Sequence, residues 1–287
     1  MGRIDRISKL KSNVKVLNIK NSDRLVIFSD CHRGDGSFKD ALYPNVNIYL
    51  TALRYYYNEN FTYIEDGDGD ELWKFKNIND IYFAHTDEYK IFNQFKQDNR
   101  FYMIYGNHDD EKAKKKFKNN IQKSKNELLK DFYLDLEIHE GLLLKFSESK
   151  DVLVFHGHQL DYISSEFAFA SKFLVRYIWS FLNGVLSFKE ILSPAKCDNV
   201  RESVDNRVYK WCKENNESVI IGHTHNTIFP DKNEIQYFNC GCCVLPYTVT
   251  CIEIKNGTIA LVKWVIKSTK DGVLAVKKEL ISSPRFV

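Results

Sequence analysis

Short apolar runs that end in polar, chemistry-bearing residues recur along this chain of 287 residues. Five of them stand out, at 24–29, 61–64, 101–105, 152–155 and 218–221. Each is rich in β-branched and aromatic side chains and is bounded by Gly, Asp or His, which is typical of strands buried on both faces. The pattern therefore predicts an α/β protein in which these five runs are strands.

The stretches around these runs predict further elements. Helix-like spacing covers 4–10, 87–97 and 127–132. The run 14–19 is expected to be an edge strand. Asn256-Gly257 separates the apolar runs 249–254 and 258–266, and this dipeptide favours a tight turn between two antiparallel strands.

The chain shows no internal repeat and no Ser/Gly-rich linker, so a single domain over 1–287 is expected, with 159–199 inserted between two strands. Within the insertion, 167–188 is the most apolar stretch, but Lys172 and Arg176 interrupt it. It falls short of the ~18–20 uninterrupted apolar residues of a membrane span. We expect a helical hydrophobic cap, for which core or homodimer packing is the alternative interpretation.

The amino-acid composition is typical of a globular protein and argues against several other classes. Hydrophobic residues make up 44% and charged residues 28%, as in ordinary globular proteins. The net charge of +3 argues against a dedicated nucleic-acid binder. Seven cysteines without framework spacing favour a reducing compartment. The start, Met1 to Arg6, is charged and lacks an apolar segment, which predicts no secretory signal. We expect a cytoplasmic protein, peripheral to the inner face of the membrane at most.

The histidines gather at the ends of the predicted strands. Of eight in the chain, six lie there: His32, His108, His156, His158, His223 and His225. The ends of strands are where α/β sheets place their sites. A dinuclear metal site needs about seven O/N ligands, one of them a carboxylate that bridges both ions. The chain supplies that number: Asp30, His32, Asp68, Asn107, His156, His223 and His225. In an extended chain, residues two apart point to the same side, so Asp30 is expected to act with His32, and His223 with His225.

The set of motifs resembles the calcineurin-like metallophosphoesterases. The matching segments are Asp30-x-His32, Gly67-Asp68-x-x-Glu71, Gly106-Asn107-His108-Asp109, His156-Gly157-His158 and Gly222-His223-Thr224-His225. The resemblance implies a four-layer α/β/β/α sandwich with two metal ions at the strand ends. It assigns one ion to Asp30, His32, Asp68 and His225, and the other to Asp68, Asn107, His156 and His223.

The resemblance also implies a reaction. Two divalent ions lower the pKa of a bridging water, and the hydroxide attacks phosphorus. His108 is then the acid for the leaving oxygen, with Glu71 orienting it. Arg33 is a candidate for a bidentate contact to the phosphate, with a surface arginine as the alternative. The family favours Mn, and Fe or Zn fit the ligands equally well.

An insertion after the His-Gly motif resembles the bacterial UDP-2,3-diacylglucosamine hydrolases, which cleave a lipid-linked nucleotide pyrophosphate. This chain departs from them at His108, where they typically carry Arg, and at His158, where they carry Asp. We therefore predict a metal-dependent phosphoesterase or pyrophosphatase whose substrate is a phosphorylated small molecule or a lipid-linked nucleotide. Rival interpretations are a cyclic-nucleotide phosphodiesterase, a Ser/Thr protein phosphatase and, from another class, a non-catalytic partner-binding scaffold.

The chain also carries a basic run and a group of cysteines. The basic run Lys112 to Lys118, continued at Lys123, Lys125 and Lys130, is expected to be a solvated helix face, with anionic lipid or a polyanionic substrate as the functional alternative. Cys240, Cys242 and Cys243 lack the spacing of a zinc knuckle and are expected to be buried free thiols.

Overall fold

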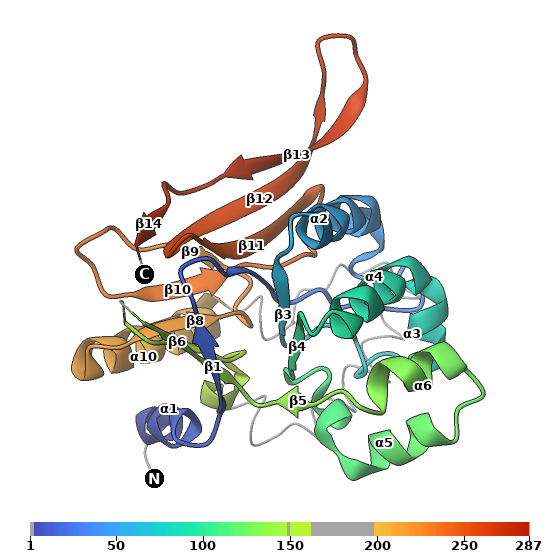
Figure 1. The fold of residues 1–287 in the computed structure, drawn as a ribbon, viewed down its shortest axis with the longest axis horizontal. Helices are drawn as coiled ribbons and strands as arrows, with labels where there is room; N and C mark the ends of the chain where they lie inside the picture. Colours follow the sequence, from blue (N-terminus) through green and yellow to red (C-terminus); the bar gives the residue numbers. More distant parts are fainter. Residues whose placement is uncertain (1–2, 148–149, 162–197, 287) are drawn as a thin grey trace.

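The computed structural model describes residues 3–147, 150–161 and 198–286 (Figure 1). Its α-helices are α1 (Arg3–Lys11), α2 (Val46–Asn58), α3 (Ile78–Ala84), α4 (Thr86–Gln97), α5 (Lys115–Gln122), α6 (Glu127–Tyr133) and α10 (Asp198–Asn215). Single 3-10 turns lie at Tyr43–Asn45, Asp110–Ala113 and His158–Leu160.

The strands form two mixed sheets. The six-stranded sheet has the order β1 (Lys15–Ile19), β6 (Leu142–Phe146), β7 (Val152–Val154), β8 (Ser218–Ile221), β10 (Tyr237–Cys240), β9 (Thr227–Ile228). The eight-stranded sheet has the order β13 (Leu274–Leu280), β12 (Thr258–Ser268), β11 (Thr248–Lys255), β2 (Arg24–Phe28), β3 (Thr62–Asp66), β4 (Phe101–Ile104), β5 (Ile138–His139), and β14 (Arg285–Phe286) pairs with β12.

The central strands are apolar throughout because both of their faces are covered. In β2, Val26 and Phe28 pack into the core beneath the helices α2 and α4, whereas Leu25 and Ile27 pack into the core between the two sheets. Successive residues of a strand point to opposite faces, so a strand covered on both sides needs an unbroken apolar run. This explains the runs that the sequence shows.

Three apolar cores separate four layers. One core lies between the eight-stranded sheet and helices α2 to α6, a second between the two sheets, and a third between the six-stranded sheet and helices α1 and α10. Figure 1 shows these helix groups on opposite sides of the paired sheets. The predicted four-layer α/β/β/α sandwich is confirmed.

Parallel pairing places the carboxyl ends of the strands that precede the predicted ligands at one edge of each sheet. β2, β3 and β4 are parallel neighbours in one sheet, and β7 and β8 are parallel neighbours in the other. The five strands predicted from sequence are all present, as are the helices at 4–10, 87–97 and 127–132, the edge strand β1 and the hairpin β11–β12. The predicted ligands that follow these strands are therefore brought close together.

The predicted cap lies outside the described residues. Of the insertion 159–199, only the two ends are described, and the apolar stretch 167–188 falls entirely within 162–197. In the parts of the chain that the structure describes, no helix combines the length and the apolar character needed to cross a bilayer.

Candidate metal centre

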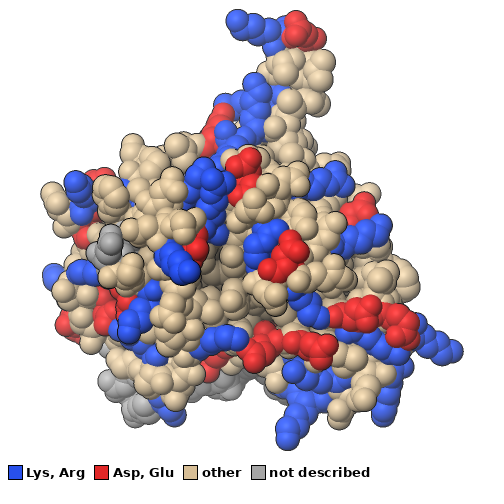
Figure 2. Space-filling model, viewed as in Figure 1, with Lys and Arg blue, Asp and Glu red and all other residues tan. Residues whose placement is uncertain are grey.

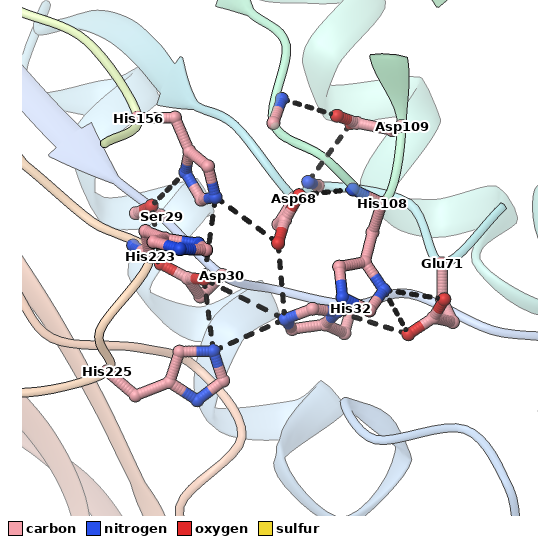
Figure 3. A network of polar contacts seen from close by, with 12 residues as sticks. Ser29, Asp30, His32, Asp68, Glu71, His108, Asp109, His156, His223 and His225 are labelled. Atoms are coloured by element: carbon pink, nitrogen blue, oxygen red, sulfur yellow. Dashed lines mark hydrogen bonds and ion pairs between the residues drawn. The ribbon is translucent and has the colours of Figure 1, made fainter. Parts of the chain in front are cut away.

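The first cluster at the strand ends consists of Asp30, His32 and His225. Asp30 Oδ1 lies 3.0 Å from His225 Nε2 and 3.7 Å from His32 Nε2, and the two imidazole nitrogens lie 3.4 Å apart (Figure 3). All three atoms converge on one small volume. A cation at that place would satisfy both nitrogen lone pairs and the carboxylate together.

The second cluster consists of Asp68, His156 and His223. Asp68 Oδ2 lies 3.2 Å from His156 Nε2 and 3.8 Å from His32 Nε2 of the first cluster. Its other oxygen, Oδ1, accepts a hydrogen bond of 2.8 Å from the backbone N–H of His108. Asp68 therefore places one carboxylate oxygen between the two clusters, as a ligand shared by two ions requires.

The hydrogen bonds around the clusters fit a metal. His156 Nδ1 lies 2.8 Å from the carbonyl oxygen of Asp66, and this bond turns His156 Nε2 toward the cluster, as partners of metal-bound imidazoles do. Three of the buried side-chain atoms that make no hydrogen bond within the described residues belong to predicted ligands: His156 Nε2, Asp30 Oδ1 and Asn107 Oδ1. The donor set of nitrogen and oxygen suits divalent ions such as Mn, Fe or Zn.

The backbone at these positions is left-handed. Ten non-glycine residues in the described chain have positive φ, and five are predicted ligands: Asp30, His32, Asp68, His223 and His225. Such conformations cost energy in non-glycine residues and cluster at functional sites. The expectation that Asp30 and His32 point to one side because the chain is extended is wrong in its premise, since their φ values are 54° and 47°. Left-handed backbone places Asp30 and His32 in one cluster, whereas His223 and His225 lie in different clusters, so the expectation that these two act together is wrong.

Glycine is required where the loops approach closely. A Cβ at Gly106 would lie 2.1 Å from Asp68 Oδ1. A Cβ at Gly67, whose φ is 76°, would lie 2.5 Å from the ring of His156. Larger residues at either position would push a predicted ligand out of place.

The aspartates of the clusters raise the pKa values of the neighbouring histidines. Burial opposes the charged form of His156, but Asp68 and Asp30 outweigh it and raise the pKa of His156 to about 10. Asp30 likewise outweighs burial and raises the pKa of His225 to about 9. Both imidazoles are therefore protonated at pH 7, whereas a metal needs them neutral.

Metal binding is consequently expected to release protons. Between pH 7 and 8.5 the affinity for Mn²⁺ should rise about tenfold per pH unit for each proton released, because protons and metal compete for the same nitrogens. Calorimetric titration at pH 7 in two buffers of different ionisation enthalpy measures the number of protons released. The same apparent enthalpy in both buffers would contradict this expectation.

His108 lies beside the clusters in a fixed orientation. Glu71 Oε1 and Oε2 lie 2.8 and 2.9 Å from His108 Nδ1, and the ring stacks on Trp73 with centroids 4.2 Å apart and an interplanar angle of 20°. Glu71 Oε2 also lies 3.3 Å from His32 Nδ1, so His32, Glu71 and His108 form a third polar cluster. The Glu71 carboxylate thus links a predicted ligand to the predicted acid.

Arg33 does not reach the site, and the prediction that it contacts phosphate is wrong. Its guanidinium is fully buried and donates to both oxygens of Glu65, at 2.7 and 2.9 Å, and to Asp70 Oδ1 at 2.7 Å. These bonds engage the Nε, Nη1 and Nη2 positions of the guanidinium with buried carboxylates of the protein. Arg33 is a buried ion-pair partner, and not the surface arginine of the alternative interpretation.

A second buried cation completes this network. Lys112 Nζ lies 2.6 Å from Asp70 Oδ2 and 2.8 Å from Asp109 Oδ2, and all three side chains are fully buried. Asp109 Oδ1 also accepts 2.7 Å from the N–H of Gly106. The solvated face expected for the basic run is therefore wrong at Lys112. Its ammonium group helps to hold the loops that carry Asp68 and the His108 motif.

Several supporting residues were not found from sequence. Asp161 Oδ2 lies 3.4 Å from His223 Nε2. Asp205, on α10, accepts from the Thr224 hydroxyl at 3.1 Å and from Asn226 at 3.3 Å, which braces the loop of His223. No local signal marks these residues, because their partners come from distant segments. Lys112 could have been suspected from Asp109, three residues earlier and therefore one helical turn away.

The thiols of the cysteine cluster are free, as predicted. Cys240, Cys242 and Cys243 are buried and unpaired by disulfides. Cys31 Sγ lies 3.5 Å from Cys243 Sγ and packs in the core beneath the helices. Cys31 therefore lies on the core side of its loop and in none of the three clusters.

A family model of calcineurin-like phosphoesterases matches residues 23–227. The chain belongs to this family. In this calcineurin-like phosphoesterase the matched segment contains every predicted ligand, from Asp30 to His225, and also His108 and Glu71. A search of curated proteins by sequence finds no match.

Solved structures with a similar fold share little sequence with the chain. Vps29 (vacuolar protein sorting 29) from Cryptosporidium parvum is 12% identical with a TM-score of 0.39, covering 91% of this chain and 98% of that one. Vps29 from Chaetomium thermophilum is 9% identical with a TM-score of 0.37, covering 91% and 97%. A putative 5′-nucleotidase from Staphylococcus aureus, in complex with α-ketoglutarate, is 13% identical with a TM-score of 0.35, covering 90% and 53%.

Proposed function

We propose that this protein is a hydrolase that cleaves phosphoester or pyrophosphate bonds with the help of two divalent metal ions. The observation that carries the proposal is the position of Asp68, whose Oδ2 lies between two Asp/His clusters. His108 lies beside these clusters, because its backbone N–H donates to Asp68 and its ring is held by Glu71. The site therefore combines candidate metal ligands with a candidate proton donor. That combination is what hydrolysis at phosphorus needs.

Each residue has a distinct task in this proposal. Asp30, Asp68 and the histidines of both clusters would hold two divalent ions. Once bound, such ions would supply an activated water nucleophile and neutralise the phosphoryl oxygens. Glu71 accepts a hydrogen bond from the Nδ1–H of His108, which leaves the Nε2–H of His108 to give its proton to the leaving oxygen. Trp73 stacks on the His108 ring and limits its rotation.

The finer assignments are proposals that rest on family resemblance. Mn is favoured as the metal, and the absence of cysteine from the three clusters agrees with a hard or borderline ion. A lipid-linked nucleotide pyrophosphate is the proposed substrate, with segment 167–188 accepting acyl chains or contacting a membrane.

The reaction class is tested with a substrate panel in the presence of Mn²⁺. UDP-linked lipids, cyclic nucleotides, phosphomonoesters and phosphopeptides are compared, each with and without a chelator. We expect turnover of at least one class, and its loss on chelation. Turnover of none of them would refute the hydrolase and favour a non-catalytic scaffold.

Replacing His108 by alanine is expected to lower kcat by roughly 10²–10⁴-fold on alkyl esters, because the leaving oxygen loses its acid. Nitrophenyl esters should lose much less, since nitrophenolate leaves without a proton. Metal content, measured by elemental analysis, should stay at the wild-type value.

The matched control is His139→Ala, a partly buried histidine whose imidazole faces Glu137 outside the clusters. It should leave both substrates unaffected. If His108→Ala loses a metal ion, or if alkyl and nitrophenyl esters suffer equally, His108 is not the acid.

A further inference from the structure

A tight turn of the chain lies directly against His223. Gly157 has a φ of 109°, and a Cβ at this position would lie 3.4 Å from the Cβ of His223. The 3-10 turn His158–Leu160 begins there, and the backbone N–H of Asp161 donates 3.1 Å to the carbonyl oxygen of His158. This turn brings the Asp161 side chain to the ring of His223, where Asp161 Oδ2 lies 3.4 Å from Nε2.

Two helices hold this turn in place. Arg6, on α1, donates 3.2 Å to the carbonyl oxygen of Gln159, and Arg207, on α10, donates to the carbonyl oxygen of Leu160. The Leu160 side chain is fully buried in the core between the six-stranded sheet and these two helices. Asp161 itself is only 2% exposed. Its carboxylate is therefore fixed beside the imidazole by the surrounding structure.

Two other predicted ligands show what such a contact does. In each of them a protein oxygen holds one ring nitrogen, and the other nitrogen faces the clusters. His156 Nδ1 lies 2.8 Å from the carbonyl oxygen of Asp66, and its Nε2 lies 3.2 Å from Asp68 Oδ2. His32 Nδ1 lies 3.3 Å from Glu71 Oε2, and its Nε2 lies 3.8 Å from the same oxygen of Asp68. Outer partners of this kind orient metal-bound imidazoles.

His223 fits the same arrangement with its two nitrogens exchanged. Its ring lies 5.2 Å from that of His156 (Figure 3), and one of its nitrogens belongs to the second cluster together with Asp68 and His156. Its Nε2 faces Asp161. Asp161 belongs to none of the three clusters found among the described residues, so it has the position of an outer partner and not of a further ligand.

We propose that Asp161 orients His223, whose ring donates its Nε2–H to Asp161 and presents Nδ1 to the second ion. The inference rests on the proposed function, because it concerns the metal ions of that same site. Asp161 is a positioning residue, since it acts through His223. Its loss should weaken the ion held by Asp68, His156 and His223 and leave the ion of the first cluster nearly unchanged.

The test measures the binding of Mn²⁺ to the metal-free protein by titration calorimetry, without any substrate. We expect Asp161→Ala to weaken one of two Mn²⁺ sites by about 10–100-fold, as the loss of an outer partner typically does, and the other by less than about threefold. Asp161→Leu fills the buried position without an acceptor and should show the same loss, which keeps the test decisive if the alanine variant does not fold. Asp161→Asn keeps an acceptor oxygen and should lose much less.

A double-mutant cycle shows whether the effect passes through His223. Adding Asp161→Ala to His223→Ala should weaken Mn²⁺ binding by less than about twofold further, because no ring is left to orient. A separate structural role of Asp161 would instead give the same loss in both backgrounds.

The matched control is Glu140→Ala, which removes the same charge beside the same turn, where the carbonyl oxygen of Glu140 accepts from Gln159. Acidic and basic side chains are interspersed over the face of the molecule in Figure 2, and salt screens exposed charges. Loss of this exposed carboxylate should therefore leave both Mn²⁺ sites at wild-type affinity.

The outcomes separate this inference from the proposed function. Wild-type affinity at both sites in Asp161→Ala and Asp161→Leu would overturn the inference, as would an equal loss in the His223→Ala background or in Glu140→Ala. Turnover of an ester together with any of these results would leave the hydrolase standing. If the expected losses appear and no ester is turned over, the role of Asp161 stands and the hydrolase is refuted.

Discussion

Replacing Asp68 by alanine is expected to abolish metal-dependent turnover, with a loss of about 10³-fold or more. Its carboxylate Oδ2 lies between the two clusters, so its removal takes a ligand from both proposed ions. Several kcal/mol of transition-state stabilisation depend on the ions, and each 1.4 kcal/mol is worth tenfold in rate. Elemental analysis should find well below two ions per chain.

Asp30→Ala is the matched comparison for this result. Asp30 Oδ1 lies closer to His225 and His32 of the first cluster, at 3.0 and 3.7 Å, than to His156 of the second, at 4.0 Å. This variant should therefore lose the first ion more readily than the ion held by His156 and His223. Two tightly bound ions in Asp68→Ala would refute the bridging assignment. Equal metal loss in the two variants would instead mean that the clusters bind as one cooperative unit.

Replacing Lys112 by methionine is expected to lower the free energy of unfolding by about 3–5 kcal/mol, because breaking a buried ion pair leaves uncompensated charge in the interior. Asp70 and Asp109 both lose their contact with the ammonium group. The midpoint of urea unfolding, monitored by circular dichroism, measures the change.

Lys114→Met is the control, two residues further along the same basic run. Its exposed side chain pairs with Asp110 at 2.8 Å, and such pairs contribute under about 1 kcal/mol. Similar midpoints for the two variants would show that the buried network contributes no more than a surface ion pair, which would contradict its proposed role in holding the loops.

The sequence predicts the central sheet well for a physical reason. Each strand of the site is covered on both faces, so its apolar run is unbroken and its end is marked by polar residues, as at Phe28 before Asp30 and Ile221 before His223. The helix α2 (Val46–Asn58) gives no comparable signal. Tyr49 and Tyr56 occupy buried positions on it, and tyrosines there obscure the apolar spacing of a helix.

The residue types of the site are visible in the sequence, but their partners are not. Arg33 and Lys112 are of two residue types that are mostly exposed. Their burial requires Glu65 and Asp70, from β3 and the loop after it, and Asp109, from the loop after β4. The left-handed turns at the ligands are also hidden, because aspartate and histidine carry no obligatory backbone preference. Only the fold reveals these features.

Each cluster takes its side chains from both sheets. Asp30 follows β2 of the eight-stranded sheet and His225 follows β8 of the six-stranded sheet, while Asp68 follows β3 and meets His156 after β7. A bound ion in either cluster would therefore fasten the two halves of the sandwich to each other, much as a disulfide joins distant segments of a chain. Any movement of one sheet relative to the other would distort the metal–ligand bonds of both ions. The metal pair would therefore cross-link the two sheets in addition to its chemical role.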